Sequence, residues 1–215
     1  MTLALALLLS FIRVDVESGA VNARDWPSEP PVNTGSLLKP FIALAYAQSH
    51  QFQYPQITCK RCWLPRGHGR LTIENAIAQS CNTYFDELRA QTPDGDFAAT
   101  LRRFGITTYP QVQPEDILRA YIELTRRKTE PGIAPLLEGM RRAATIGTAK
   151  ELAIPDAFAK TGTAPCTHKP KAPGDGFAII LTPTQQPRTA IIVRLHGRPG
   201  AHAAREAGGL LRQNR

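Results

Sequence analysis

Hydrophobic and polar positions divide the chain into strand-like regions near both ends and a helix-like region between them. Alternation over residues 12–16, followed by Ser-Gly, predicts a β-hairpin over residues 11–24. Apolar spacings of three and four predict helices over 36–49, 72–90, 96–104, 114–127 and 134–146. Strand-like runs return at 156–164, 175–183 and 188–197, and a short helix over 201–212 follows them.

This segregation of strands and helices predicts an α+β fold. We expect an antiparallel sheet built from N- and C-terminal strands, flanked by helices and carrying an inserted, mainly helical lobe. Residues 11–215 are expected to form a single domain, because a chain of 215 residues can bury a full core.

Residues 1–10 form an apolar N-terminal segment that precedes the predicted hairpin. It is too short to cross a bilayer, which needs about 20 residues. It also lacks a charged leading region and a clear cleavage site. We interpret it as the remnant of a signal or anchor, and expect the real one to be missing, upstream or degenerate.

Composition narrows the class of protein only partly. The content of 42% hydrophobic and 20% charged residues is that of a soluble globular protein. The net charge of +8 would suit an acidic partner such as nucleic acid, an anionic polymer or a membrane surface. However, the basic residues are spread over several predicted helices without interleaved aromatic residues. We therefore interpret them as solvated helix faces and expect no nucleic-acid partner.

Four cysteines raise the question of a metal or a disulfide. Two of them form Cys59-x-x-Cys62 in "ITCKRCWLPRGHG", and the others are Cys81 and Cys166. The pair could form a local disulfide, act as a redox pair, or supply half of a zinc site together with His68, Cys166 or His168. Because no second Cys-x-x-Cys exists, we favour a structural disulfide or plain packing over a metal.

The segment "NTGSLLKPF" places Ser36 and Lys39 three positions apart at the start of a predicted helix. Such residues share a helix face, so the Lys39 amine could reach the Ser36 hydroxyl. A serine is a poor nucleophile until a base takes its proton, and a lysine can serve if burial lowers its pKa. The apolar neighbours would supply that burial.

Two further segments carry polar residues that local structure alone would also explain. In "AQSCNTYF", Ser80 and Asn82 have the residue types of helix caps and turns. In "AKTGTA", Lys160 and Thr161 precede Gly162 and Thr163 within a predicted strand. Glycine weakens a strand unless something approaches the backbone closely, as a ligand carboxylate would here.

Taken in order, Ser-x-x-Lys, Ser-x-Asn and Lys-Thr-Gly resemble the motif set of penicillin-binding proteins and serine β-lactamases. The likeness extends to "RVDVESGAVNA", "GHGRLTIENAIAQSCNTYF", "VQPEDILRAYIEL" and "LLEGMRRAATIGTAKEL", which are similar to successive stretches of a penicillin-binding transpeptidase domain. It covers residues 11–212, nearly the whole chain.

The resemblance implies a serine acyl transfer at D-Ala-D-Ala termini of peptidoglycan stem peptides. Ser36 would attack the D-Ala-D-Ala carbonyl with Lys39 as its base, and the Ser36 and Thr163 amides would form the oxyanion hole. Ser80 and Lys160 would deliver a proton to the departing D-Ala. Asn82 would hold the substrate amide and Lys39. Thr161 and Thr163 would bind the terminal carboxylate, and Gly162 would let the ligand lie against the strand.

The same resemblance implies no cofactor and no catalytic metal, a periplasmic or other extracytoplasmic location, and β-lactams as covalent inhibitors. Cell-wall synthesis proteins would be partners. The alternatives are a DD-carboxypeptidase, a β-lactamase-like hydrolase, and a module that binds β-lactams or cell wall without turnover. We expect the chain to lack the family's N-terminal pedestal and membrane helix, and its second and third motifs are closely spaced. We therefore expect an open cleft whose activity is weak or needs a partner chain.

Overall fold

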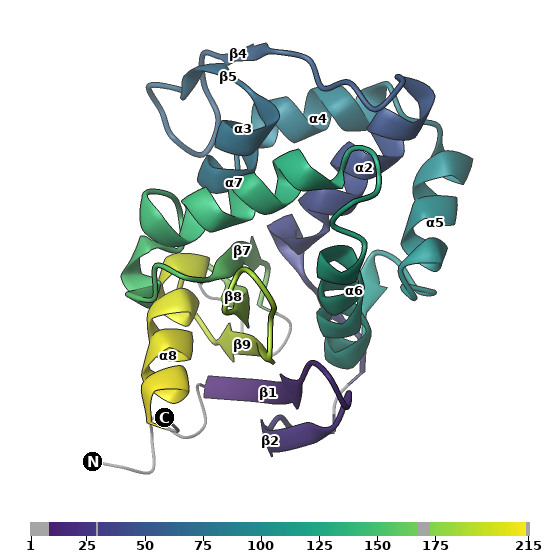
Figure 1. The fold of residues 1–215 in the computed structure, drawn as a ribbon. Coiled ribbons are helices and arrows are strands. Elements are labelled where there is room, and N and C mark those ends of the chain that lie inside the picture. The colour runs from purple at the N-terminus through teal and green to yellow at the C-terminus, as the bar shows by residue number, and fades with distance from the viewer. Residues whose placement is uncertain (1–8, 29, 167–172, 214–215) are drawn as a thin grey trace.

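A five-stranded antiparallel sheet and a helical lobe make up the computed structural model, which describes residues 9–28, 30–166 and 173–213 (Figure 1). The strand order is β2-β1-β9-β8-β7, so strands from the two ends of the chain lie side by side. Their bounds are β1 Leu9–Asp15, β2 Val21–Asp25, β7 Phe158–Ala164, β8 Asp175–Thr182 and β9 Thr189–Leu195. The predicted α+β architecture is confirmed.

Most helices lie between β2 and β7 in the chain. They are η1 Gly35–Leu38, α2 Lys39–Ser49, α3 Ile73–Gln79, α4 Asn82–Ala90, α5 Asp94–Arg103, α6 Pro114–Arg126, α7 Ile133–Thr145 and η2 Lys150–Leu152, and α8 Gly200–Arg212 follows the last strand. Two small ladders pair β3 Val32–Asn33 with β6 Gln111–Val112 and β4 Ile57–Cys59 with β5 Gly69–Leu71.

The continuous helix predicted over residues 72–90 is wrong. The chain instead forms α3 and α4, because Ser80 adopts a left-handed conformation with φ of 49° and ends the first helix. The apolar spacing runs through the break because both helices bury their apolar sides in the same core. The predicted helix over 36–49 is also divided, since its first turn, η1, is a 3₁₀ helix.

The sheet separates two layers of apolar side chains. Residues alternate between the faces of a strand, so Ile179 and Ile180 of β8 belong to different clusters. Ile179 packs with the side chains of η1, α2 and α6, whereas Ile180 packs with the alanines of α8. Strands β7, β8 and β9 are therefore buried on both faces, which fixes the position of β7 against the helical lobe.

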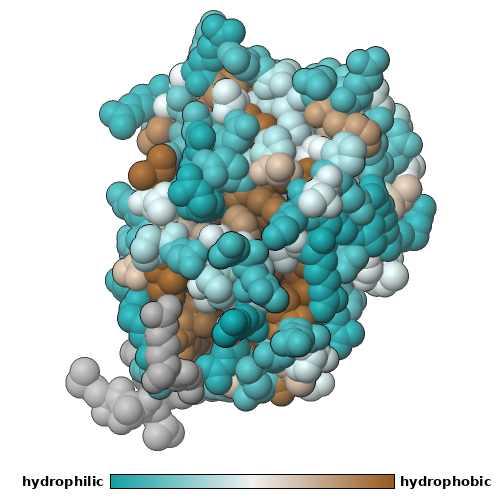
Figure 2. Space-filling view, viewed as in Figure 1, coloured by the Kyte–Doolittle hydropathy of each residue, from teal (hydrophilic) through white to brown (hydrophobic). Residues whose placement is uncertain are grey.

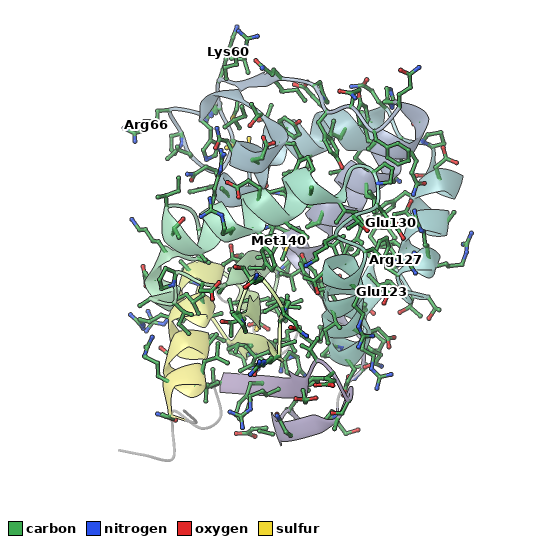
Figure 3. The ribbon with its side chains drawn as sticks, in the orientation of Figure 1. Lys60, Arg66, Glu123, Arg127, Glu130 and Met140 are labelled. Atoms are coloured by element: carbon green, nitrogen blue, oxygen red, sulfur yellow. The ribbon has the colours of Figure 1, made fainter. Side chains whose placement is uncertain are left out.

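Several basic residues of the helices form ion pairs at the surface. Just after α6, Arg127 contacts Glu123 at 2.6 Å and Glu130 at 3.9 Å, and Figure 3 shows these three side chains together. In α7, Arg141 and Arg142 share Glu138. Polar side chains cover much of the face seen in Figure 2. These runs of positive charge therefore serve as solvated helix faces.

The predicted apolar segment over residues 1–10 lies mostly outside the described residues, since β1 begins at Leu9. His168 lies outside them as well. Within the described ranges, no helix is both long and apolar enough to cross a membrane.

Neighbouring glycines in α8 offer a test of this packing. A Cβ at position 208 would lie 2.1 Å from the backbone oxygen of Leu152, whereas a Cβ at position 209 would meet nothing within 4 Å. We expect Gly208→Ala to destabilise the fold by about 1–3 kcal/mol through overpacking. Gly209→Ala is the matched control and should stabilise it by up to about 1 kcal/mol. Urea unfolding measures both, and a shift of the same sign and size in the two variants would contradict the close approach of α8 to η2.

Candidate active site

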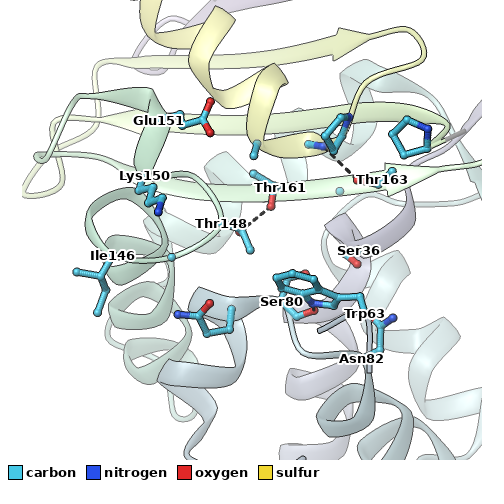
Figure 4. A pocket seen from close by; sticks show the side chains of 17 residues that line it. Ser36, Trp63, Ser80, Asn82, Ile146, Thr148, Lys150, Glu151, Thr161 and Thr163 are labelled. Atoms are coloured by element: carbon cyan, nitrogen blue, oxygen red, sulfur yellow. Dashed lines mark hydrogen bonds between the residues drawn. The ribbon is translucent and has the colours of Figure 1, made fainter. Parts of the chain in front are cut away.

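A pocket of about 580 Å³ lies where β7 meets the helical lobe. Figure 4 shows side chains from η1, the α3–α4 turn and β7 around it. The lining includes Ser36, Ser80, Asn82, Thr161, Gly162 and Thr163, which are six of the predicted site residues. Lys39 and Lys160 are buried next to it and contact Ser80. Segments more than a hundred residues apart in the chain are thus brought together.

Ser36 is placed by close contact between η1 and β7. Gly162 is central to this contact, because a Cβ there would lie 2.4 Å from the Thr34 backbone oxygen and 3.2 Å from Leu37 Cγ. The close approach that its residue type suggested is therefore made by the chain's own backbone. It holds the half-buried Ser36 beside the strand that carries Lys160.

Lys39 begins α2 and is only 7% exposed. Its Nζ donates to the Ser80 carbonyl oxygen at 2.7 Å and to Asn82 Oδ1 at 2.7 Å, and lies 3.4 Å from Ser80 Oγ. Burial lowers the pKa of Lys39 to about 8, and the nearby Asp86 carboxylate opposes this shift. Two short bonds use both N–H groups of a neutral amine and leave its lone pair to accept a proton.

The expected direct contact between Lys39 and Ser36 is not among the hydrogen bonds of the described residues. The reason is local, because Ser36 lies in a 3₁₀ turn while Lys39 starts an α-helix. The amine is directed instead toward the α3–α4 turn, which brings Ser80 and Asn82 to the same side of the pocket as Ser36.

Lys160 contacts the same serine from the sheet. Its Nζ donates to Ser80 Oγ at 2.8 Å and to the Thr161 carbonyl oxygen at 2.7 Å, and the side chain is fully buried. Burial, and secondarily the charge of Lys39, hold the pKa of Lys160 well below its usual range. Ser80 therefore lies between two lysines in a site that disfavours two positive charges.

β7 is the edge strand of the sheet, paired with β8 on one side only. Its residues Thr161, Gly162 and Thr163 line the pocket. Thr161 Oγ1 donates to Thr148 Oγ1 at 2.7 Å, and the Gly200 amide donates to Thr163 Oγ1 at 3.1 Å. An extended ligand could therefore pair with the backbone of this edge and reach both hydroxyls.

Among the pocket residues that sequence reasoning missed, Thr148 and Trp63 form hydrogen bonds with predicted site residues. Thr148 positions Thr161, and Trp63 donates from Nε1 to the Ser80 carbonyl oxygen at 3.2 Å while remaining 51% exposed. Thr148 lies within "TIGTAKEL" and Trp63 directly follows Cys62, so both were adjacent to segments already singled out. Only the tertiary fold places them in the pocket.

Comparisons with known proteins bear on the family and the fold of this chain. The family model described as the penicillin-binding protein transpeptidase domain matches residues 13–116. No curated protein matches the chain.

Solved structures share the fold at low sequence identity. One is Pseudomonas aeruginosa PBP2 in complex with WCK 5153, with a TM-score of 0.76, 14% identity, and coverage of 94% of this chain and 72% of that one. The transpeptidase domain of the FtsI4 D,D-transpeptidase from Legionella pneumophila gives a TM-score of 0.70 at 17% identity, covering 97% and 90%.

A third structure is the complex between PBP2 and MreC from Helicobacter pylori, with a TM-score of 0.76, 14% identity, and coverage of 96% of this chain and 60% of that one. The family match over residues 13–116 and the shared fold together confirm the resemblance to penicillin-binding protein transpeptidase domains.

Proposed function

We propose that this domain is a DD-transpeptidase that forms an acyl-enzyme on Ser36. The Ser36 oxygen would attack the carbonyl of the D-Ala-D-Ala bond in a stem peptide, and D-Ala would leave with its amine. An amine of a neighbouring stem would then displace Ser36. The observation that supports this most strongly is the convergence of Lys39 and Lys160 on Ser80 at the pocket lined by Ser36.

The lysines have different proposed roles. Lys39 would accept the Ser36 proton, because its lowered pKa makes a neutral amine accessible and Asn82 fixes its direction. Ser80 would pass a proton to the departing D-Ala amine, and Lys160 would support it through the 2.8 Å bond. The two lysines thus separate acceptance of a proton from its delivery.

Substrate binding would use the edge of β7. Thr161 and Thr163 would bind the terminal carboxylate, and Asn82 would contact the substrate amide. The backbone amides of Ser36 and Thr163 would stabilise the oxyanion, a contribution that is often the largest electrostatic one in acyl transfer. Gly162 would keep the strand close to η1, as its packing requires.

The proposal extends to location and partners. We place the domain outside the cytoplasm, where peptidoglycan is assembled, with β-lactams as covalent inhibitors. The complex of Helicobacter pylori PBP2 with MreC gives a precedent for cell-wall synthesis proteins as partners. Residues 11–215 are proposed to act as one domain. A carboxypeptidase or β-lactamase-like hydrolase would instead pass the acyl group to water, and a binding module would keep it.

The nucleophile is tested by intact-mass analysis after incubation with a fluorescent penicillin. Wild type should gain the mass of one penicillin, and Ser36→Ala should gain none because the attacking oxygen is absent. Ser49→Ala, at the far end of α2, is the control and should label like wild type. An unlabelled wild type would overturn the acyl-enzyme, and a labelled Ser36→Ala would move the nucleophile elsewhere. Rapid loss of the adduct with antibiotic hydrolysis would support a β-lactamase instead.

The base is tested by the pH dependence of acylation. Since burial lowers the pKa of Lys39 to about 8, the amine is protonated below that pH and neutral above it. We expect the acylation rate to rise about tenfold per pH unit below pH 8 and to level off above it. Lys39→Arg should abolish acylation at every pH, because a guanidinium keeps its proton. A wild-type rate that stays constant from pH 6 to 9 would exclude this role.

A further inference from the structure

Three cysteines and a histidine gather beside the α3–α4 turn. They are Cys59, Cys62, His68 and Cys81, and their potential ligand atoms all lie within 4.8 Å of one another. Cys59 and Cys81 are fully buried, while Cys62 and His68 are partly covered. No disulfide joins any of the chain's cysteines, all of which lie in the described ranges.

Three separate segments supply these side chains. Cys59 ends β4, and the loop between β4 and β5 returns so that the His68 amide donates to the Cys59 carbonyl oxygen at 3.1 Å. Cys81 comes from the distant α3–α4 turn, where the left-handed Ser80 redirects the chain. Figure 3 shows Lys60 and Arg66 of the loop pointing away from the molecule. Cys59 and Cys62 instead contribute to the cluster, and Cys59 is buried.

Two of the six separations between ligand atoms fit a tetrahedral zinc ion. Zinc lies about 2.3 Å from sulfur and about 2.0–2.1 Å from nitrogen, which sets sulfur and nitrogen about 3.5 Å apart and two sulfurs about 3.8 Å apart. His68 Nδ1 lies 3.6 Å from Cys59 Sγ and 3.2 Å from Cys62 Sγ. These separations match the tetrahedral values to within about 0.3 Å.

The chemistry of these four side chains favours zinc over other metals and argues against a disulfide. Three thiolates and an imidazole favour zinc over hard cations such as magnesium or calcium, which prefer oxygen ligands. A Cys59–Cys62 disulfide would use two of the four groups and leave no common role for Cys81 and His68. The set also provides four protein ligands, which is typical of a closed structural zinc site.

The cluster is connected to the turn that carries Ser80 and Asn82. Cys81 lies between these two residues in the chain, and Trp63, next to Cys62, donates to the Ser80 carbonyl oxygen at 3.2 Å. On the other side of the turn, Thr83 Oγ1 donates to the Arg61 carbonyl oxygen at 2.8 Å. Anything that fixes the loop over residues 60–68 therefore also fixes the turn that Lys39 contacts.

We propose that Cys59, Cys62, His68 and Cys81 bind one structural zinc ion, and that the ion positions the Ser80–Asn82 turn. On binding, the three thiols release their protons to solvent and the histidine binds as a neutral ring through Nδ1. The site then carries a net charge of about −1, from three thiolates and one Zn²⁺. The positioning role rests on the proposed function, whereas the zinc site does not.

Zinc binding is tested by elemental analysis and native mass spectrometry of the purified full chain. We expect about one zinc per wild-type chain, near-complete loss in Cys59→Ser and Cys81→Ser, and no change in the control Cys166→Ser. His68→Ala should weaken binding, and His68→Cys should restore it by supplying a fourth thiolate. These measurements are repeated in the Ser36→Ala background, where no acyl-enzyme is expected. Zinc-free folded wild type with a Cys59–Cys62 disulfide, or equal zinc in all variants, would overturn the site.

The positioning role is tested by removing zinc with a chelator and restoring it. In a Trp26→Phe variant, the fluorescence of Trp63 reports on the loop without reference to activity, since the chain has two tryptophans. We expect zinc removal to change this fluorescence and to slow penicillin acylation at least tenfold, with both effects reversed by added zinc. Fluorescence and acylation that do not respond to zinc would overturn the positioning role. A fluorescence response without any acylation in either state would instead count against the proposed function.

Discussion

The burial of two lysines around one serine hydroxyl is the constraint on which the rest of the site depends. Lys39 and Lys160 both reach Ser80 Oγ, at 3.4 Å and 2.8 Å, and neither amine is accessible enough to be well hydrated. Two ammonium groups at this separation and burial would repel one another strongly, so the site favours at least one neutral amine. A neutral amine can accept a proton, and this links the packing of the domain to its proposed chemistry.

This arrangement requires Ser80 to adopt a conformation that its residue type disfavours. A non-glycine residue in the left-handed region costs on the order of 1 kcal/mol or more. The turn is retained because it ends α3, presents the Ser80 carbonyl oxygen to Lys39 and Trp63, and directs the side chain toward Lys160. The strain is therefore located at the point where the helical lobe meets the sheet.

Much of the fold could be predicted because its signals are local. Alternation identified β1, strand-like runs identified the three C-terminal strands, and apolar spacing identified α5, α6 and α7. The division of 72–90 into two helices could not be read in this way, since its cause is the backbone conformation of Ser80. The paired strands β3–β6 and β4–β5 have only two or three residues each, which is too short for a periodic pattern.

The candidate site likewise contains residues that local sequence signals identified and residues that only the fold identifies. The motifs around Ser36, Ser80 and Lys160 were visible because their residue types recur in a recognisable order, whereas Thr148 and Trp63 acquire their roles from contacts made across the fold. The cysteines show most clearly what could not be predicted from the sequence. Sequence reasoning offered His68 among the partners of Cys59-x-x-Cys62 but not Cys81, because Cys81 already belonged to another motif. Since Cys81 contributes to the cluster while its neighbours contact Lys39, a change in the cluster must act on Ser80 and Asn82 through one shared turn.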